Sequence, residues 1–150
     1  MIDMCLWRYN TTVPASPADV LELLTEPGAI ARWAPIPFEV VALDGTRLES
    51  GSRARVAGRL AGQSVEFDVD VLRVSDERLE LVAEGPIVLD VQYRLRAAGT
   101  ESEIEASVSV QGRGFLGRVL AKATETLLAA GALRMSMDRL ANELQPALAA

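Results

Sequence analysis

The stretch from Gly112 to Leu144, GRGFLGRVLAKATETLLAAGALRMSMDRLANEL, decides the fold that we expect for this chain. Its apolar residues recur at the i, i+3, i+4, i+7 spacing of one buried stripe on an amphipathic helix. The stripe consists of Leu116, Val119, Leu120, Ala123, Leu127, Ala130, Leu133, Met137, Leu140, Ala141 and Leu144. A helix of roughly thirty residues is about 45 Å long. It must lay its stripe on another layer, and a curved antiparallel sheet is the partner we expect.

Two residues inside this helix are unusual. Gly131 costs about 1 kcal/mol relative to alanine in a helix interior, so this thin segment either packs closely or leaves room. Arg134 projects in the same direction as Leu116 on a helical wheel. It can extend its charge to water at the edge of the stripe and pair with Asp138, or it can face an internal cavity.

The chain before this helix shows the period-two alternation of antiparallel strands, with turn signals at regular intervals. The predicted strands are 3–13, 38–43, 52–60, 63–74, 78–84, 87–97 and 102–111. Two-residue turns at 61–62 and 99–100 would place opposite charges across from each other outside and apolar side chains inside. The pairs are Arg53–Asp70, Arg55–Asp68, Val56–Phe67, Arg94–Glu105, Arg96–Glu103 and Leu95–Ile104. Val71 and Leu72 compete for the inner face, which predicts a bulge.

A helix-start signal follows the first strand. Ser16 is a good N-cap, Pro17 occupies the first helical position, and Asp19 places a carboxylate in the first turn. We expect a helix from Pro17 and a second short one through Trp33.

The amino-acid composition limits the possible classes of function. A chain of 150 residues with 49% hydrophobic residues predicts a single globular domain over 1–150. The net charge of −6 argues against nucleic acid as a partner. Cys5 is the only cysteine, which favours a cytoplasmic location, and no apolar run is long enough to predict a membrane span.

The chain contains no histidine. This excludes Ser-His-Asp and Cys-His nucleophile systems and histidine-ligated metals, and we expect neither a metal nor a cofactor. The segment 112–117 matches G-x-G-x-x-G, but a dinucleotide site also needs a following parallel strand. We therefore expect its glycines to shape the crossing from sheet to helix.

The segment VPASPADVLELLTEP at 13–27, followed by Ala31-Arg32-Trp33, resembles the opening of polyketide cyclase/dehydrase-type (SRPBCC) proteins of the START-like, Bet v 1-like superfamily. The resemblance implies an α+β helix-grip fold of about seven strands in β-α-α-β6-α order, with a cavity between the curved sheet and the C-terminal helix. Fold and activity are separable in this superfamily.

The resemblance implies binding of a hydrophobic small molecule, lipid or polyketide-like, in that cavity. The predicted ligand-binding residues are Trp33, Phe38, Val56, Phe67, Leu81, Leu89, Tyr93, Val108, Phe115, Leu127, Arg134 and Met137. Tyr93 and Arg134 are the candidates to orient a polar ligand group or to act in catalysis. Alternatively, Tyr93 bonds a backbone carbonyl and Trp33 plugs the core.

Two other functions remain open. One is a cofactor-independent polyketide aromatase/cyclase or dehydratase using Tyr93 and Arg134, although the assigned inner face carries no Asp, Glu or Lys. The other is a packed interaction module without a ligand. A homodimer is a further candidate assembly.

Overall fold

In the computed structural model, which describes residues 5–26, 28–29, 38–43, 45–60, 62–112 and 114–144, the chain forms a seven-stranded antiparallel sheet. The strands are β1 (Cys5–Val13), β2 (Phe38–Leu43), β3 (Arg53–Leu60), β4 (Gln63–Ser75), β5 (Arg78–Glu84), β6 (Ile87–Ala98) and β7 (Glu101–Gly112). Their spatial order is β1-β7-β6-β5-β4-β3-β2, so β1 joins the meander beside β7. The sheet is open rather than closed into a barrel.

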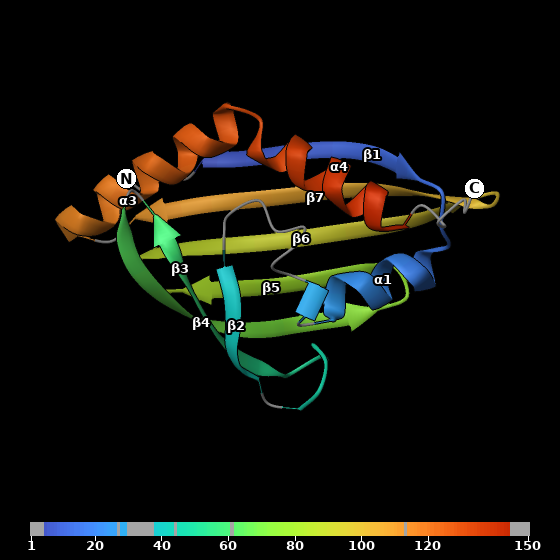
Figure 1. The fold of residues 1–150 in the computed structure, drawn as a ribbon, viewed down its shortest axis with the longest axis horizontal. Helices are drawn as coiled ribbons and strands as arrows, with labels where there is room; N and C mark the ends of the chain where they lie inside the picture. The colour runs from blue at the N-terminus through green and yellow to red at the C-terminus, as the bar shows by residue number, and fades with distance from the viewer. Residues whose placement is uncertain are drawn as a thin grey trace.

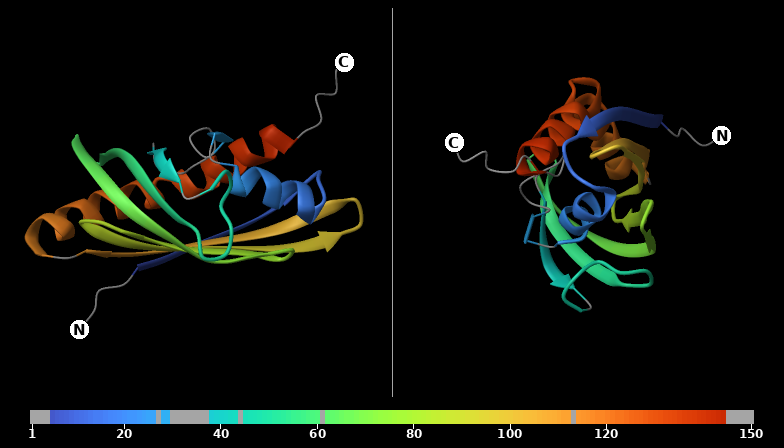
Figure 2. Two further views of the ribbon diagram at one scale, coloured as in Figure 1. Left: turned by 90° about the horizontal axis from the view of Figure 1, so that it is seen from below. Right: turned by 90° about the vertical axis from the view of Figure 1, so that its right-hand side faces the viewer.

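Helices cover one face of the curved sheet. They are α1 (Pro17–Thr25), α3 (Gly114–Ala129) and α4 (Ala132–Leu144). Figures 1 and 2 show α1 held within the curve of the sheet, while α3 and α4 run across it towards β1. This arrangement confirms the predicted α+β helix-grip fold.

Both predicted hairpin registers are confirmed. Arg53 and Arg55 pair with Asp70 and Asp68, each at 3.3 Å, and Arg96 forms an ion pair with Glu103. The apolar partners also meet as expected, with Val56 opposite Phe67 and Leu95 opposite Ile104. The predicted bulge lies in β4, where the register with β5 shifts between Val71 and Arg73.

The start of α1 follows the predicted capping pattern. The Ser16 hydroxyl accepts a hydrogen bond from the Asp19 backbone N–H at 3.2 Å, and Pro17 begins the helix. Val20 and Leu24 are fully buried, which anchors the helix to the core. The predicted second short helix through Trp33 lies almost entirely outside the described residues.

The C-terminal helical segment is interrupted at Gly131. Its φ of 96° lies in the left-handed region that favours glycine, and this residue separates α3 from α4. The Met135 N–H donates to the Gly131 carbonyl oxygen at 2.9 Å, so Gly131 caps the start of α4. The expectation of one continuous helix is therefore corrected to two helices in sequence.

The predicted buried stripe is shifted in phase over α3, although Leu120, one of its members, is buried. The buried residues there are Gly117, Leu120, Ala121, Thr124 and Leu128. Leu116, Val119 and Leu127, which were assigned to the stripe, are 54%, 47% and 41% exposed. In α4 the assignment of Leu133, Met137 and Leu140 to the core is confirmed.

Glycine contacts at the start of α3 explain this phase. A Cβ on Gly117 would lie 2.4 Å from the Pro86 carbonyl oxygen in the β5–β6 turn, and a Cβ on Gly112 would lie 2.6 Å from the Gly117 oxygen. Backbone therefore packs directly on backbone, and the Gly117 side of the helix faces the sheet. The glycines of the 112–117 motif thus have a structural role at the sheet-to-helix crossing, as predicted.

Candidate functional site

The concave face of the sheet presents rows of inward side chains that run across neighbouring strands. One row contains Leu79, Tyr93, Ala106 and Tyr9, and the next contains Leu81, Val91, Val108 and Trp7. Alternation along each strand sends these residues towards α1, α3 and α4. Their contiguous apolar surface is the candidate ligand-binding site.

Most predicted site residues lie in this interior. Val56, Phe67, Leu89, Tyr93, Val108 and Met137 are buried, and Leu81 is partly buried against them. Trp33 lies outside the described residues, and so does the side chain of Phe38, whose backbone belongs to β2. The structure therefore brings residues from the sheet and from α4 together, as expected.

Three predicted site residues are not in the interior. Phe115 is 87% exposed at the start of α3, and Leu127 lies on the same exposed side. Arg134 is exposed on α4, so the interpretation in which it faces an internal cavity is wrong. The glycine contacts that set the phase of α3, together with the break at Gly131, turn these side chains away from the sheet.

The interior carries no buried ionised side chain among the described residues. Besides Tyr93, its buried polar residues are Thr25, Ser52, Ser102, Thr124 and Ser136. The Thr124 hydroxyl donates to the Leu120 carbonyl oxygen at 2.9 Å, and the Ser102 hydroxyl donates to the Ala15 carbonyl oxygen at 2.6 Å. The site can therefore accept apolar groups, but it offers no carboxylate or ammonium group for acid–base chemistry.

Tyr93 is the largest buried polar side chain of the site. It is 2% exposed at the centre of β6, and desolvation by burial raises the pKa of its phenol above the ordinary value. The phenol therefore stays protonated at neutral pH. It can donate a hydrogen bond, but it cannot serve as a base.

Trp7 lies on the inward face of β1 and is not among the predicted site residues. It lies opposite Val108 and packs against the core cluster. Its indole Nε1 atom is buried and has no hydrogen-bond partner. The sequence signal was the tryptophan on an inward position. The lack of an acceptor is visible only in the folded protein.

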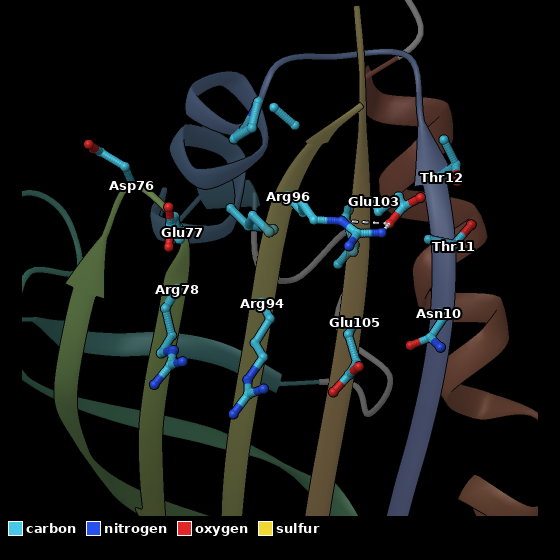
Figure 3. A pocket seen from close by; sticks show the side chains of 14 residues that line it. Asn10, Thr11, Thr12, Asp76, Glu77, Arg78, Arg94, Arg96, Glu103 and Glu105 are labelled. Atoms are coloured by element: carbon cyan, nitrogen blue, oxygen red, sulfur yellow. Dashed lines mark hydrogen bonds and ion pairs between the residues drawn. The ribbon is translucent and has the colours of Figure 1, made fainter. Parts of the chain in front are cut away.

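A hollow of about 930 Å³ lies over the ends of β5, β6, β7 and β1 (Figure 3). Its charged lining residues are Arg78, Arg94, Arg96, Asp76, Glu77, Glu103 and Glu105. The ion pair of Arg96 with Glu103 crosses it, and Arg78 pairs with Glu80 at 3.1 Å. Because the charges of both signs are interleaved, this groove does not favour an anionic or a cationic ligand. Sequence reasoning placed Arg94, Arg96, Glu103 and Glu105 only in ion pairs on the outer face of the sheet.

The described ranges also bear on two other kinds of site. No cluster of three or more Cys, Asp or Glu side chains there could hold a metal ion. Among the helices of that part of the chain, none combines the length and the apolar character needed to cross a membrane.

The family of this chain follows from a sequence comparison. Residues 4–145 match the family described as polyketide cyclase / dehydrase and lipid transport, and the chain belongs to that family. A search of curated proteins finds no match to the sequence.

Solved structures share the fold. A START superfamily protein from Mycobacterium smegmatis is 15% identical with a TM-score of 0.67, over 93% of this chain and 99% of the other. The aromatase/cyclase Zhui from a Streptomyces species is 14% identical with a TM-score of 0.64, over 97% and 98%. DynU16, from the dynemicin biosynthetic locus, is 25% identical with a TM-score of 0.60. That match covers 93% of this chain, which spans about half of DynU16, 47% of its length.

Proposed function

We propose that the protein binds a hydrophobic small molecule, a lipid or a polyketide-like compound, between the concave face of the sheet and the helices. The observation that carries the proposal is the chemical character of that face, which is predominantly apolar and free of buried ionised groups in the described part of the chain. Membership of a family whose description joins polyketide cyclases with lipid transport supports the same class of ligand.

The enzymatic alternative is a polyketide aromatase/cyclase or dehydratase. Enolisation and dehydration need groups that move protons at the reacting carbon. Of the two predicted candidates, Arg134 is exposed and Tyr93 is a buried phenol with a raised pKa. Tyr93 alone could polarise a carbonyl by donating a hydrogen bond, so we favour binding over catalysis. We also place the protein in the cytoplasm, because its single cysteine suits a reducing compartment.

The first test is native mass spectrometry of the protein purified gently from its own host, followed by solvent extraction. The proposal expects a lipophilic compound bound in stoichiometric amount. A titration with the neutral fluorescent probe N-phenyl-1-naphthylamine tests the same site in the empty protein. A protein that arrives empty and takes up no probe would contradict the proposal and favour the packed interaction module.

Two matched variants locate the binding site. Ala106 is fully buried on the concave face, whereas its neighbour Ser107 projects from the other face of β7. We expect Ala106→Leu to weaken probe binding by filling the space and Ser107→Leu to leave it unchanged, provided that both variants fold by circular dichroism. Arg134→Ala is expected to have no effect, because that side chain is exposed. Loss of binding in Arg134→Ala or in Ser107→Leu would place the site elsewhere.

A further inference from the structure

An unsatisfied donor in an otherwise apolar region is the observation that extends the proposed function. Trp7 stands at the end of an inward row that continues through Val108 and Val91 to Leu81. The indole Nε1 atom is shielded from water and meets no hydrogen-bond acceptor. Native proteins rarely leave such a group unpaired, because it loses its bond to water and gains nothing in return.

Two kinds of acceptor could satisfy this N–H group. A buried water needs two to four polar partners of its own. The described inward side chains that flank Trp7 are Tyr9 on β1 and Ala106, Val108 and Val110 on β7. Tyr9 alone among them carries a polar group, which is fewer partners than a buried water needs. An acceptor atom that arrives as part of a hydrophobic molecule needs no such partners, because the rest of that molecule contacts the apolar wall.

The charge of this molecule also follows from the interior. The buried polar residues of the described chain are serines, threonines and the protonated Tyr93, and none of them can neutralise an ion. A carboxylate or ammonium group in this place would lose its hydration without gaining a counter-charge. The ligand is therefore neutral.

We propose that the Trp7 indole N–H donates a hydrogen bond to an acceptor oxygen, such as a carbonyl, of a neutral hydrophobic ligand and thereby orients it against β7 and β1. This inference rests on the proposed function, since it names the ligand class and the orienting group of the same site. In this proposal Trp7 orients the ligand, a role that the sequence suggested for Arg134.

A matched pair of probes tests the inference. Fluorene and 9-fluorenone share one rigid ring system, and only the second carries a carbonyl oxygen. The chain has two tryptophans, Trp7 and Trp33, so the indole region of a proton–nitrogen correlation spectrum contains two signals. Trp7→Phe assigns them by removing one. We expect 9-fluorenone to shift the Trp7 indole proton downfield, as hydrogen bonding does, and fluorene to cause no such shift.

Binding affinities give an independent measurement. Trp7→Phe keeps an aromatic ring but removes the donor, so it should weaken 9-fluorenone binding by about 3- to 10-fold and leave fluorene binding unchanged. Ser107→Ala, on the outer face of β7, is the control and should change neither affinity.

The outcomes distinguish a failure of the inference about Trp7 from a failure of the proposed binding function. If both probes bind wild type and Trp7→Phe alike, with no selective shift of the indole signal, the role of Trp7 is refuted while the binding function stands. If the indole proton is already shifted downfield in the free protein and does not respond to 9-fluorenone, a water is its acceptor and the inference is likewise refuted. If neither probe binds, the proposed function fails together with the inference. If Trp7→Phe does not fold, Trp33→Phe assigns the two signals by removing the other one, and the selective shift in the wild-type protein decides.

Discussion

Replacing Gly131 by alanine tests the break between α3 and α4 through the sign of the change in stability. In a continuous helix, alanine in place of an interior glycine would increase the free energy of unfolding by about 1 kcal/mol. In the observed structure Gly131 has a φ of 96°, which alanine adopts only with strain. The two architectures therefore predict opposite effects of one substitution.

The magnitude follows from the surroundings of Gly131. A Cβ placed on this residue would find no atom within 4 Å, so the change adds no steric clash and its cost is that of the backbone conformation alone. Left-handed conformations cost residues with a Cβ about 1–2 kcal/mol. We expect Gly131→Ala to lower the free energy of unfolding by this amount and to lower Tm by about 2–8 °C for a chain of this size.

Urea denaturation with linear extrapolation measures the change, and two variants control it. Gly131→Asn should cost less than Gly131→Ala, because asparagine tolerates positive φ better. Gly45 is exposed and has a φ of 101°, and a Cβ on it would also find no atom within 4 Å, so Gly45→Ala should cost about as much as Gly131→Ala. A Gly131→Ala protein as stable as wild type, or more stable, would refute the reasoning and favour one continuous helix.

Three further predictions concern stability. Phe67 is 1% exposed and Phe115 is 87% exposed. In urea denaturation, Phe67→Ala should lower the free energy of unfolding by about 3–5 kcal/mol, and Phe115→Ser should lower it by less than about 0.5 kcal/mol. Similar losses in the two variants would contradict the observed burial. Ser16→Ala removes the acceptor for the Asp19 N–H and should cost about 1 kcal/mol, whereas Ser16→Asp, which keeps an acceptor, should cost little. Burial raises the pKa of the Tyr93 phenol, so above pH 10 the unfolded chain loses the phenol proton before the folded protein does. The free energy of unfolding should then fall by up to about 1.4 kcal/mol per pH unit. Tyr93→Phe should make this fall less steep, and an unchanged slope would contradict the raised pKa.

Local patterns predicted the sheet almost to the residue. Charge and side-chain alternation together specified both hairpins, because a slip of one residue would have placed Arg55 and Phe67 on the wrong faces. The competition between two adjacent apolar residues, Val71 and Leu72, predicted the bulge in β4 for the same reason. These features depend on neighbours in the chain, so sequence alone can reveal them.

The orientation of α3 could not be predicted in this way. Its sequence carries two apolar arcs, one with Leu120 and Leu128 and the other with Leu116 and Val119, and periodicity fits either of them. The choice between them depends on the close approach of Gly117 to the Pro86 carbonyl oxygen, a contact between residues that are distant in the chain. The prediction of Leu127 as a site residue depended on the other arc facing the sheet, whereas that of Phe115 depended on its place at the crossing from sheet to helix.

By itself the sequence determined the antiparallel meander, the capped first helix, the helical C-terminal segment and the apolar, histidine-free character of the interior. Only the tertiary structure decided which arc of α3 is buried, where the helix breaks, that Arg134 points outward and that the indole N–H of Trp7 lacks an acceptor. The physical reason is the range of the interactions. Strand register and helix caps arise from residues a few positions apart, whereas burial and hydrogen-bond satisfaction depend on what the completed fold places around each side chain.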